Sequence, residues 1–122
     1  MRLRLVLTIT LLFESGILES TEIRHRITLK PGREETIVRG GIPTPEDTAV
    51  YVLRFHTGQH LSIRLDPGPS LRAYALVKPP VGEQIGPGAK LEFDANQSGD
   101  FQIRIIPLEQ TSGTFRLHLR TR

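Results

Sequence analysis

The chain has 122 residues, enough for one domain and too few for a separate catalytic module beside it. It contains no cysteine, which excludes disulfides, a thiolate nucleophile and cysteine-ligated zinc or iron–sulfur centres. Sixteen Lys and Arg residues against 13 Asp and Glu give a formal net charge of +3, and a hydrophobic fraction of 38% suits a modest core of Leu, Ile and Val.

Residues 1–20 fit two descriptions. Arg2 and Arg4 precede an apolar run from Leu5 to Phe13, and small and polar residues follow, which is the order of a secretory signal peptide. The run is too short for a stable membrane anchor. The same leucines also alternate with polar residues as in a β-strand, and an Ala-x-Ala cleavage site is missing. We expect a signal peptide over 1–20, no membrane span in the mature form, and a periplasmic or extracellular location.

Residues 21–122 show short strand patterns separated by turn signals. Apolar residues alternate with polar ones in EIRHRITL, ETIVRG, TAVYVLRF, HLSIRLD, LRAYALV, KLEFDA, DFQIRIIP and GTFRLHLR. GGIPTPED (Gly40–Asp47) and VGEQIGPGA (81–89) are predicted to be Gly/Pro-rich loops, and the second is able to face a partner. No helical interval is long enough for a βαβ crossover. The pattern predicts an all-β fold, a single antiparallel jelly-roll-like β-sandwich of about eight strands.

Arginine carries most of the positive charge, since lysine occurs only at Lys30, Lys78 and Lys90. The arginines alternate with apolar residues along the expected strands, which predicts rows of arginine on solvent-facing sheet surfaces. Such rows are usually solvated faces, and a surface for an anionic partner is the alternative. Nucleic acid is not expected to bind, because a recognition helix, a Gly-rich clamp and an aromatic stacking platform are missing.

Two short turns stand out. In His56-Thr57-Gly58-Gln59, Gly58 supplies the turn geometry and Gln59 can tie its amide to nearby backbone, so this turn is expected to be structural. The second turn, Ser98-Gly99-Asp100, leads into a strand.

The second turn has two interpretations. Gly99 allows a positive backbone angle, Ser98 and Asp100 can hydrogen-bond neighbouring amides, and Phe101 begins the inward row of the strand that follows. On that interpretation the turn only starts a strand. The alternative is that Ser98, Gly99 and Asp100 contact a partner.

The order of these pieces resembles the bacterial pre-peptidase C-terminal domain, a secreted jelly-roll-like β-sandwich. The resemblance covers residues 48–120 and rests on AVYVLRFHTGQHLSIRLD, an apolar strand ending in Pro, SGDFQIRII and GTFRLHL. Within that group, the periplasmic inhibitors of goose-type and invertebrate-type lysozymes are similar in size and have a Ser-Gly-x-Tyr loop that enters the lysozyme cleft. The resemblance places Ser98 and Gly99 on that Ser-Gly, and Phe101 where the tyrosine stands, without its hydroxyl.

Catalytic and metal-binding motifs are absent. The sequence has no Gly-x-Ser-x-Gly elbow, His-Glu-x-x-His helix or P-loop, so we expect neither an enzyme nor a cofactor. His56 and His60 could face each other across a hairpin, but two ligands do not make a metal site. Asp66, Asp94 and Asp100 stand near strand ends, where some relatives of this sandwich hold calcium, although turn-forming aspartate is the commoner role. No metal is predicted.

These features favour a non-enzymatic secreted or periplasmic binding module, a monomer or weak dimer that recognises an envelope protein, lysozyme in particular, or a glycan. The contact surface would be the loops at one end of the sandwich, with arginine rows nearby to steer acidic ligands. The alternative is a structural accessory domain that packs against another secreted protein and has no ligand of its own.

Overall fold

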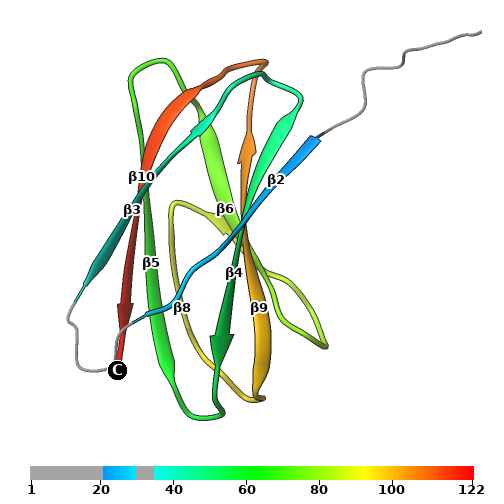
Figure 1. The fold of residues 1–122 in the computed structure, drawn as a ribbon, viewed down its shortest axis with the longest axis vertical. Helices are drawn as coiled ribbons and strands as arrows, with labels where there is room; N and C mark the ends of the chain where they lie inside the picture. Colours follow the sequence, from blue (N-terminus) through cyan, green and yellow to red (C-terminus); the bar gives the residue numbers. More distant parts are fainter. Residues whose placement is uncertain (1–20, 30–34) are drawn as a thin grey trace, which may run out of the picture.

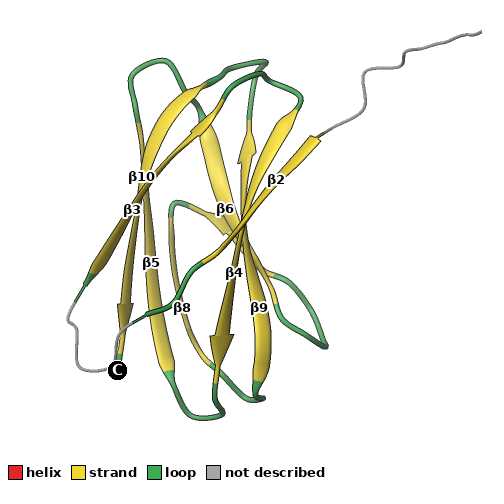
Figure 2. Cartoon of the chain, viewed as in Figure 1, coloured by secondary structure: helices red, strands yellow, loops and turns green. Residues whose placement is uncertain are grey.

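A computed structural model describes residues 21–29 and 35–122, and these form two packed β-sheets (Figure 2). None of the residues in these two ranges belongs to a helix that could cross a membrane. The signal peptide expected over residues 1–20 lies outside the described residues. The strands are β2 (Thr21–Arg26), β3 (Thr36–Ile42), β4 (Asp47–Phe55), β5 (His60–Pro67), β6 (Ala73–Lys78), β7 (Ile85–Gly88), β8 (Lys90–Asp94), β9 (Gly99–Pro107) and β10 (Gly113–Thr121).

The two sheets face each other as a sandwich (Figure 1). One sheet has the strand order β3-β10-β5-β8, and the other has the order β2-β4-β9-β6-β7. Both the all-β sandwich and its approximate strand number are confirmed, with nine strands in the described part of the chain. One pair departs from the predicted antiparallel pairing, since β2 runs parallel to β4. Between β2 and β4 the chain visits the other sheet as β3. It reverses direction before β3 and again after it, so β4 runs in the same direction as β2.

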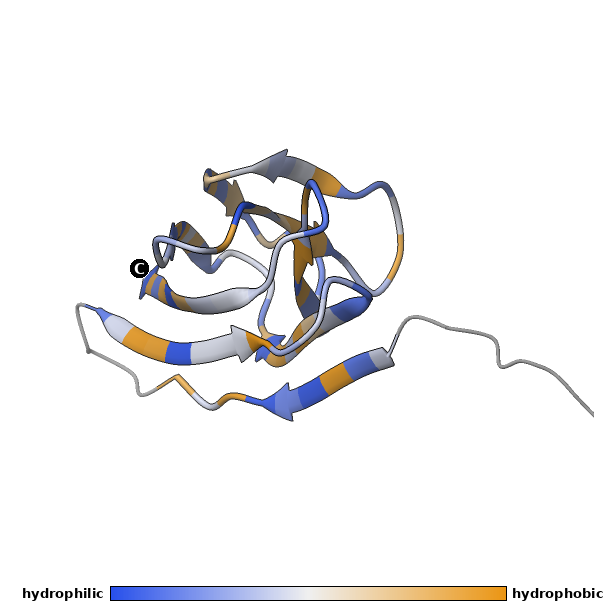
Figure 3. Ribbon diagram, turned by 90° about the horizontal axis from the view of Figure 1, so that it is seen from above, coloured by the Kyte–Doolittle hydropathy of each residue, from blue (hydrophilic) through white to orange (hydrophobic). Residues whose placement is uncertain are grey.

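Period-two alternation sends one row of apolar side chains from each strand into the space between the sheets. Bands of apolar and polar residues therefore follow one another along the strands (Figure 3). Among the described residues, Tyr51 is the only buried side chain that carries a polar group. The largest fully buried side chains are Phe55, Phe101, Ile42, Leu53, Leu61, Ile103, Ile105, Leu117 and Leu119.

Both predicted Gly/Pro loops contain strand residues. Gly40 and Ile42 belong to β3, so the loop predicted over Gly40–Asp47 was placed too early; Gly40 lies opposite Phe115 of β10 in the ladder. The second loop contains β7, which lies at an edge of its sheet. Pro87 is tolerated there because an edge strand needs only half of its backbone hydrogen bonds for the ladder. Glycine and proline signal turns locally, but pairing with a neighbouring strand overrides that signal.

Candidate functional site

Three connections gather at the lower end of the sandwich in Figure 1: the β4–β5 turn, the segment between β8 and β9, and the β6–β7 loop. Backbone hydrogen bonds join the first two. The amide of Gly58 donates to the carbonyl of Ala95 at 2.7 Å, and the amide of Ala95 donates to the carbonyl of Gln59 at 2.7 Å. These hydrogen bonds hold the two connections in a fixed arrangement, so the lower end of the sandwich presents a pre-organised surface.

The two turns that the sequence singled out contact each other. The amide of Thr57 donates a hydrogen bond to Ser98 Oγ at 3.1 Å, and the two hydroxyl oxygens lie 3.3 Å apart. Gly58 has a φ of 96°, and Gln59 Oε1 accepts a hydrogen bond from the amide of His56 at 2.7 Å. Ser98 therefore braces the neighbouring turn while remaining exposed to solvent.

The β6–β7 loop supplies an apolar residue that the sequence did not single out. Gly99 has a φ of 142°, and a Cβ built on it would lie 3.0 Å from Pro80 Cγ, so the strand start packs against this loop. Gln97 Nε2 donates to the carbonyl of Val81 at 2.7 Å. Val81 is 74% exposed, although a large apolar side chain gains free energy by leaving water. The only signal in the sequence was an apolar residue opening a Gly/Pro-rich segment.

Asp100 is tied to the first strand of its sheet. Arg26 Nη2 lies 2.7 Å from Asp100 Oδ2, and Arg26 Nη1 lies 3.3 Å from Oδ1. The hydrogen bonds from Arg26 are the largest influence on the pKa of the Asp100 carboxyl and lower it. Desolvation raises the pKa in part, and the positive charges of Arg26 and Arg54 lower it further. Both side chains stay about half exposed, so the pair offers a guanidinium and a carboxylate to a partner.

Arg26→Gln is expected to raise the pKa of Asp100 toward its ordinary value of 3.8. A carboxyl whose pKa is lowered by folding stabilises the protein above the unfolded-state pKa, and this stabilisation is lost as the pH falls through the folded-state pKa. Wild type and variant should therefore differ in melting temperature at neutral pH and converge in strongly acid solution. An NMR titration of the Asp100 carboxyl carbon measures the pKa. With Arg24→Gln as the control, an Asp100 pKa that responds equally to both substitutions would contradict the assignment.

Phe101 points away from this surface. It is 2% exposed, and its ring lies 5.3 Å from that of Phe55 in an edge-to-face arrangement and 5.6 Å from that of Phe93 in a stacked one. A phenol at this position would place its hydroxyl in the core unless the strand start moved. Phe101 therefore anchors the turn to the core, and Ser98 and Asp100 provide the groups that face solvent.

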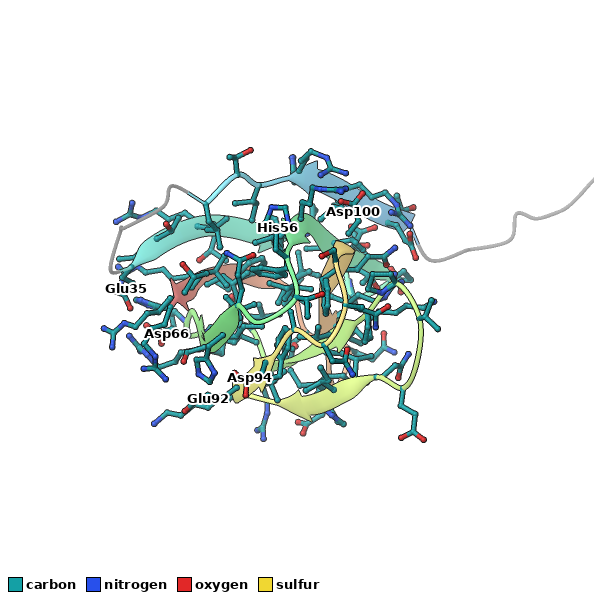
Figure 4. All side chains as sticks on the ribbon, turned by 90° about the horizontal axis from the view of Figure 1, so that it is seen from below. Glu35, His56, Asp66, Glu92, Asp94 and Asp100 are labelled. Atoms are coloured by element: carbon teal, nitrogen blue, oxygen red, sulfur yellow. The ribbon has the colours of Figure 1, made fainter. Side chains whose placement is uncertain are left out.

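Several of the histidines and aspartates considered as metal ligands contact other side chains, and Figure 4 labels His56, Asp66, Asp94 and Asp100 among them. Both ring nitrogens of His60 contact carboxylates of β8, Nδ1 with Asp94 Oδ1 at 2.8 Å and Nε2 with Glu92 Oε1 at 3.1 Å, which leaves none for an ion shared with His56. Asp66 lies opposite Arg116 in the ladder. Within residues 21–29 and 35–122, no three His, Asp or Glu side chains form a group that could hold a metal ion.

Solved structures share this architecture. PliG of Aeromonas hydrophila, a periplasmic lysozyme inhibitor of g-type lysozyme, superposes with a TM-score of 0.70 at 14% identity, over 84% of this chain and 99% of that chain. PliG of Salmonella Typhimurium superposes with a TM-score of 0.65 at 10% identity, over 82% and 98% of the two chains. This chain has the fold of those inhibitors.

The pre-peptidase C-terminal domain of a collagenase from Bacillus anthracis also superposes, with a TM-score of 0.57 at 16% identity over 83% of this chain and 96% of that domain. Both resemblances predicted from the sequence are thus confirmed at the level of the fold. No protein-family model and no curated protein sequence matches this chain.

Proposed function

We propose that the protein is a non-enzymatic periplasmic binding module whose lower end binds another protein, with a g-type lysozyme as the first candidate. The observation that carries the proposal is the braced Ser98-Gly99-Asp100 turn, held by Thr57 on one side and by Pro80 on the other. The likeness to the fold of PliG, over 84% of this chain and 99% of that chain, supports it. A pre-organised turn loses little conformational entropy on binding, which favours affinity.

The chemistry of the end suits a protein partner. Val81 offers an exposed apolar anchor, Ser98 offers a hydroxyl, and Asp100 with Arg26 offers a charge pair at the rim. An apolar centre surrounded by polar groups is the usual composition of a protein interface. Because Phe101 carries no hydroxyl and faces the core, binding would depend on these groups rather than on a phenol.

The proposal is tested by measuring how the purified protein inhibits goose-type, invertebrate-type and chicken-type lysozymes. We expect sub-micromolar inhibition of the goose-type enzyme. Val81→Asp and Asp100→Arg should each raise the inhibition constant roughly tenfold or more, which corresponds to a loss of about 1.4 kcal/mol of binding free energy or more.

Two variants provide matched controls. Leu108→Asp places an acid on an apolar residue that is 37% exposed, and Glu46→Arg reverses an exposed acid. Both residues lie in connections at the opposite end of the sandwich. They should leave inhibition unchanged. The absence of inhibition of all three enzymes would contradict the proposal and favour the accessory-domain hypothesis.

A further inference from the structure

The outer surface of the β3-β10-β5-β8 sheet carries a group of cations that the proposed function does not use. We call it the basic face, and it consists of Arg39, Arg64, Lys90, Arg116 and Arg120. Each of these residues alternates with an inward-facing residue on its strand, as Arg116 does with Leu117. The basic face is therefore a solvent-facing surface on the sheet that does not contain Ser98, Asp100 or Val81.

None of the five cations forms an ion pair with another described residue. Four acids lie on or beside this face, Glu35, Asp66, Glu92 and Asp94, which Figure 4 labels. Glu92 and Asp94 contact His60, Glu35 Oε2 lies 3.5 Å from His118 Nδ1, and Asp66 lies opposite Arg116 in the ladder without an ion pair.

The other sheet is arranged differently. Glu22 pairs with Arg24 and Arg104 there, and Asp100 pairs with Arg26. Acids of this sheet thus form ion pairs with its arginines, whereas the acids beside the basic face form none with its five cations.

The strand register brings like charges together on the basic face. Arg39 lies directly opposite Arg116 across β3 and β10, and Arg64 lies directly opposite Lys90 across β5 and β8. Like charges opposite each other destabilise a sheet. A bound anion reverses that effect, because it converts each repulsive pair into two favourable contacts.

Two hollows lie beside these pairs. The first, of about 590 Å³, is lined by Arg39 and Arg116, by the acid Asp66, and by Pro67, Gly68 and Pro69, among other residues. The second, of about 320 Å³, is lined by the cations Arg64, Lys90 and Arg120, by the acids Glu35 and Glu92, and by His118, among other residues. The proline rings of the first hollow suit the C–H face of a sugar ring. In the second, neither ring nitrogen of His118 forms a hydrogen bond with a described residue, although Nδ1 lies 3.5 Å from Glu35 Oε2. Buried polar atoms without a hydrogen bond are uncommon.

We propose that the basic face binds an acidic polysaccharide whose carboxylate groups meet its cation rows. Along β10, Arg116 and Arg120 are four residues apart, which separates them by about 13 Å in an extended strand. Arg64 lies opposite His118, midway between Arg116 and Arg120 along β10, and Lys90 lies opposite Arg64. A linear polymer with regularly spaced negative groups can therefore contact Arg116, the Arg64–Lys90 pair and Arg120 at the same time. No Phe, Tyr or Trp points outward from the described strands of this sheet, so stacking on a nucleic acid base is not provided.

The test measures binding of the full protein to polygalacturonate by isothermal titration calorimetry, with neutral dextran as the reference polymer. The double variants Arg39→Gln/Arg116→Gln and Arg64→Gln/Lys90→Gln should each weaken binding roughly tenfold or more at low salt. Raising the ionic strength should also weaken it, because salt screens exposed charges. Binding to dextran should not be detectable.

The matched control is Arg54→Gln/Lys78→Gln, which removes the same charge from the outer surface of the other sheet, where neither residue has an ion pair with a described residue. Binding of the control should match wild type. The proposal would be overturned if the control lost as much affinity as the two double variants, or if polygalacturonate did not bind. It would also be overturned if the wild type bound duplex DNA or phosphatidylglycerol vesicles more tightly than polygalacturonate. Removing a like-charge pair should leave the melting temperature unchanged or raise it, so unfolding can be separated from lost binding.

The lysozyme assay separates this proposal from the proposed function. Both double variants should inhibit lysozyme as the wild type does, because the basic face is the outer surface of a sheet, whereas the Ser98 turn lies in the connection between β8 and β9 at the lower end of the sandwich. A failure of polysaccharide binding would therefore leave the inhibition result intact, and a failure of inhibition would leave the polysaccharide result intact.

Discussion

Replacing Phe101 by alanine is expected to lower the free energy of unfolding by about 3–5 kcal/mol. The ring is 2% exposed and packs against Phe55 and Phe93 at centroid distances of 5.3 and 5.6 Å. Its removal leaves a cavity that the paired strands around it cannot close, since β9 is hydrogen-bonded on both sides. Urea denaturation followed by circular dichroism measures the change.

Phe101→Leu is the control for this prediction, because it keeps most of the apolar volume, and we expect a smaller loss, about 1.5 kcal/mol or less if the neighbours repack. The alanine variant should also lose the rigidity of the Ser98 turn, which hydrogen exchange at the Thr57 amide would report. Equal stabilities for the alanine and leucine variants would show that the ring does not fill a packed site.

Replacing Gly40 by valine is expected to destabilise the protein by about 1–3 kcal/mol or more. A Cβ built on Gly40 would lie 2.7 Å from Cζ and 3.0 Å from Cε1 of Phe115, and would also overlap the hydroxyl of Tyr51. Tyr51 is buried and packs edge-to-face against Phe115, so neither ring has free space into which to move. Thermal unfolding measures the change.

The neighbouring glycine provides a matched control. A Cβ on Gly41 would meet only the carbonyl oxygen of Gly113, at the ordinary contact distance of 3.5 Å. Gly41→Val should therefore be close to neutral, because valine favours a strand conformation. Tyr51→Phe combined with Gly40→Ala should recover part of the stability lost by Gly40→Ala alone, since it removes the overlapping hydroxyl. If valine destabilised both positions equally, the close packing at Gly40 would not be its cause.

The candidate site was partly predictable. Gly58, Gln59 and the Ser98-Gly99-Asp100 turn stood out because glycine between strand patterns signals a turn through local backbone preferences. The contact between Thr57 and Ser98 joins residues 41 positions apart. No local pattern encodes such a contact, because it depends on which strands pair.

The solvent exposure of Val81 was also not predictable from the sequence. Its sequence context indicates a loop, but that context does not say whether the side chain is buried or exposed. Only the arrangement of the β6–β7 loop, fixed by the hydrogen bond from Gln97 and by Pro80 packing at Gly99, leaves the side chain in solvent. The exposure is a property of the assembled sandwich.

The sequence by itself determined the faces of the strands and most of the strands, with β7 as the exception. Side chains alternate across a strand with period two, so the rows that contain Phe101, Ile103 and Ile105, or Phe115, Leu117 and Leu119, could face the core only as they do. The same local rule placed the arginines on the outer surfaces.

Tertiary structure decided which strands are neighbours and therefore what faces each residue. It set β2 parallel to β4, drew Gly40 and Pro87 into strands, placed Arg39 opposite Arg116, and paired Arg26 with Asp100. These outcomes depend on contacts between residues far apart in the chain, and the free energy of such contacts is set by the packing of the two sheets rather than by local conformational preference.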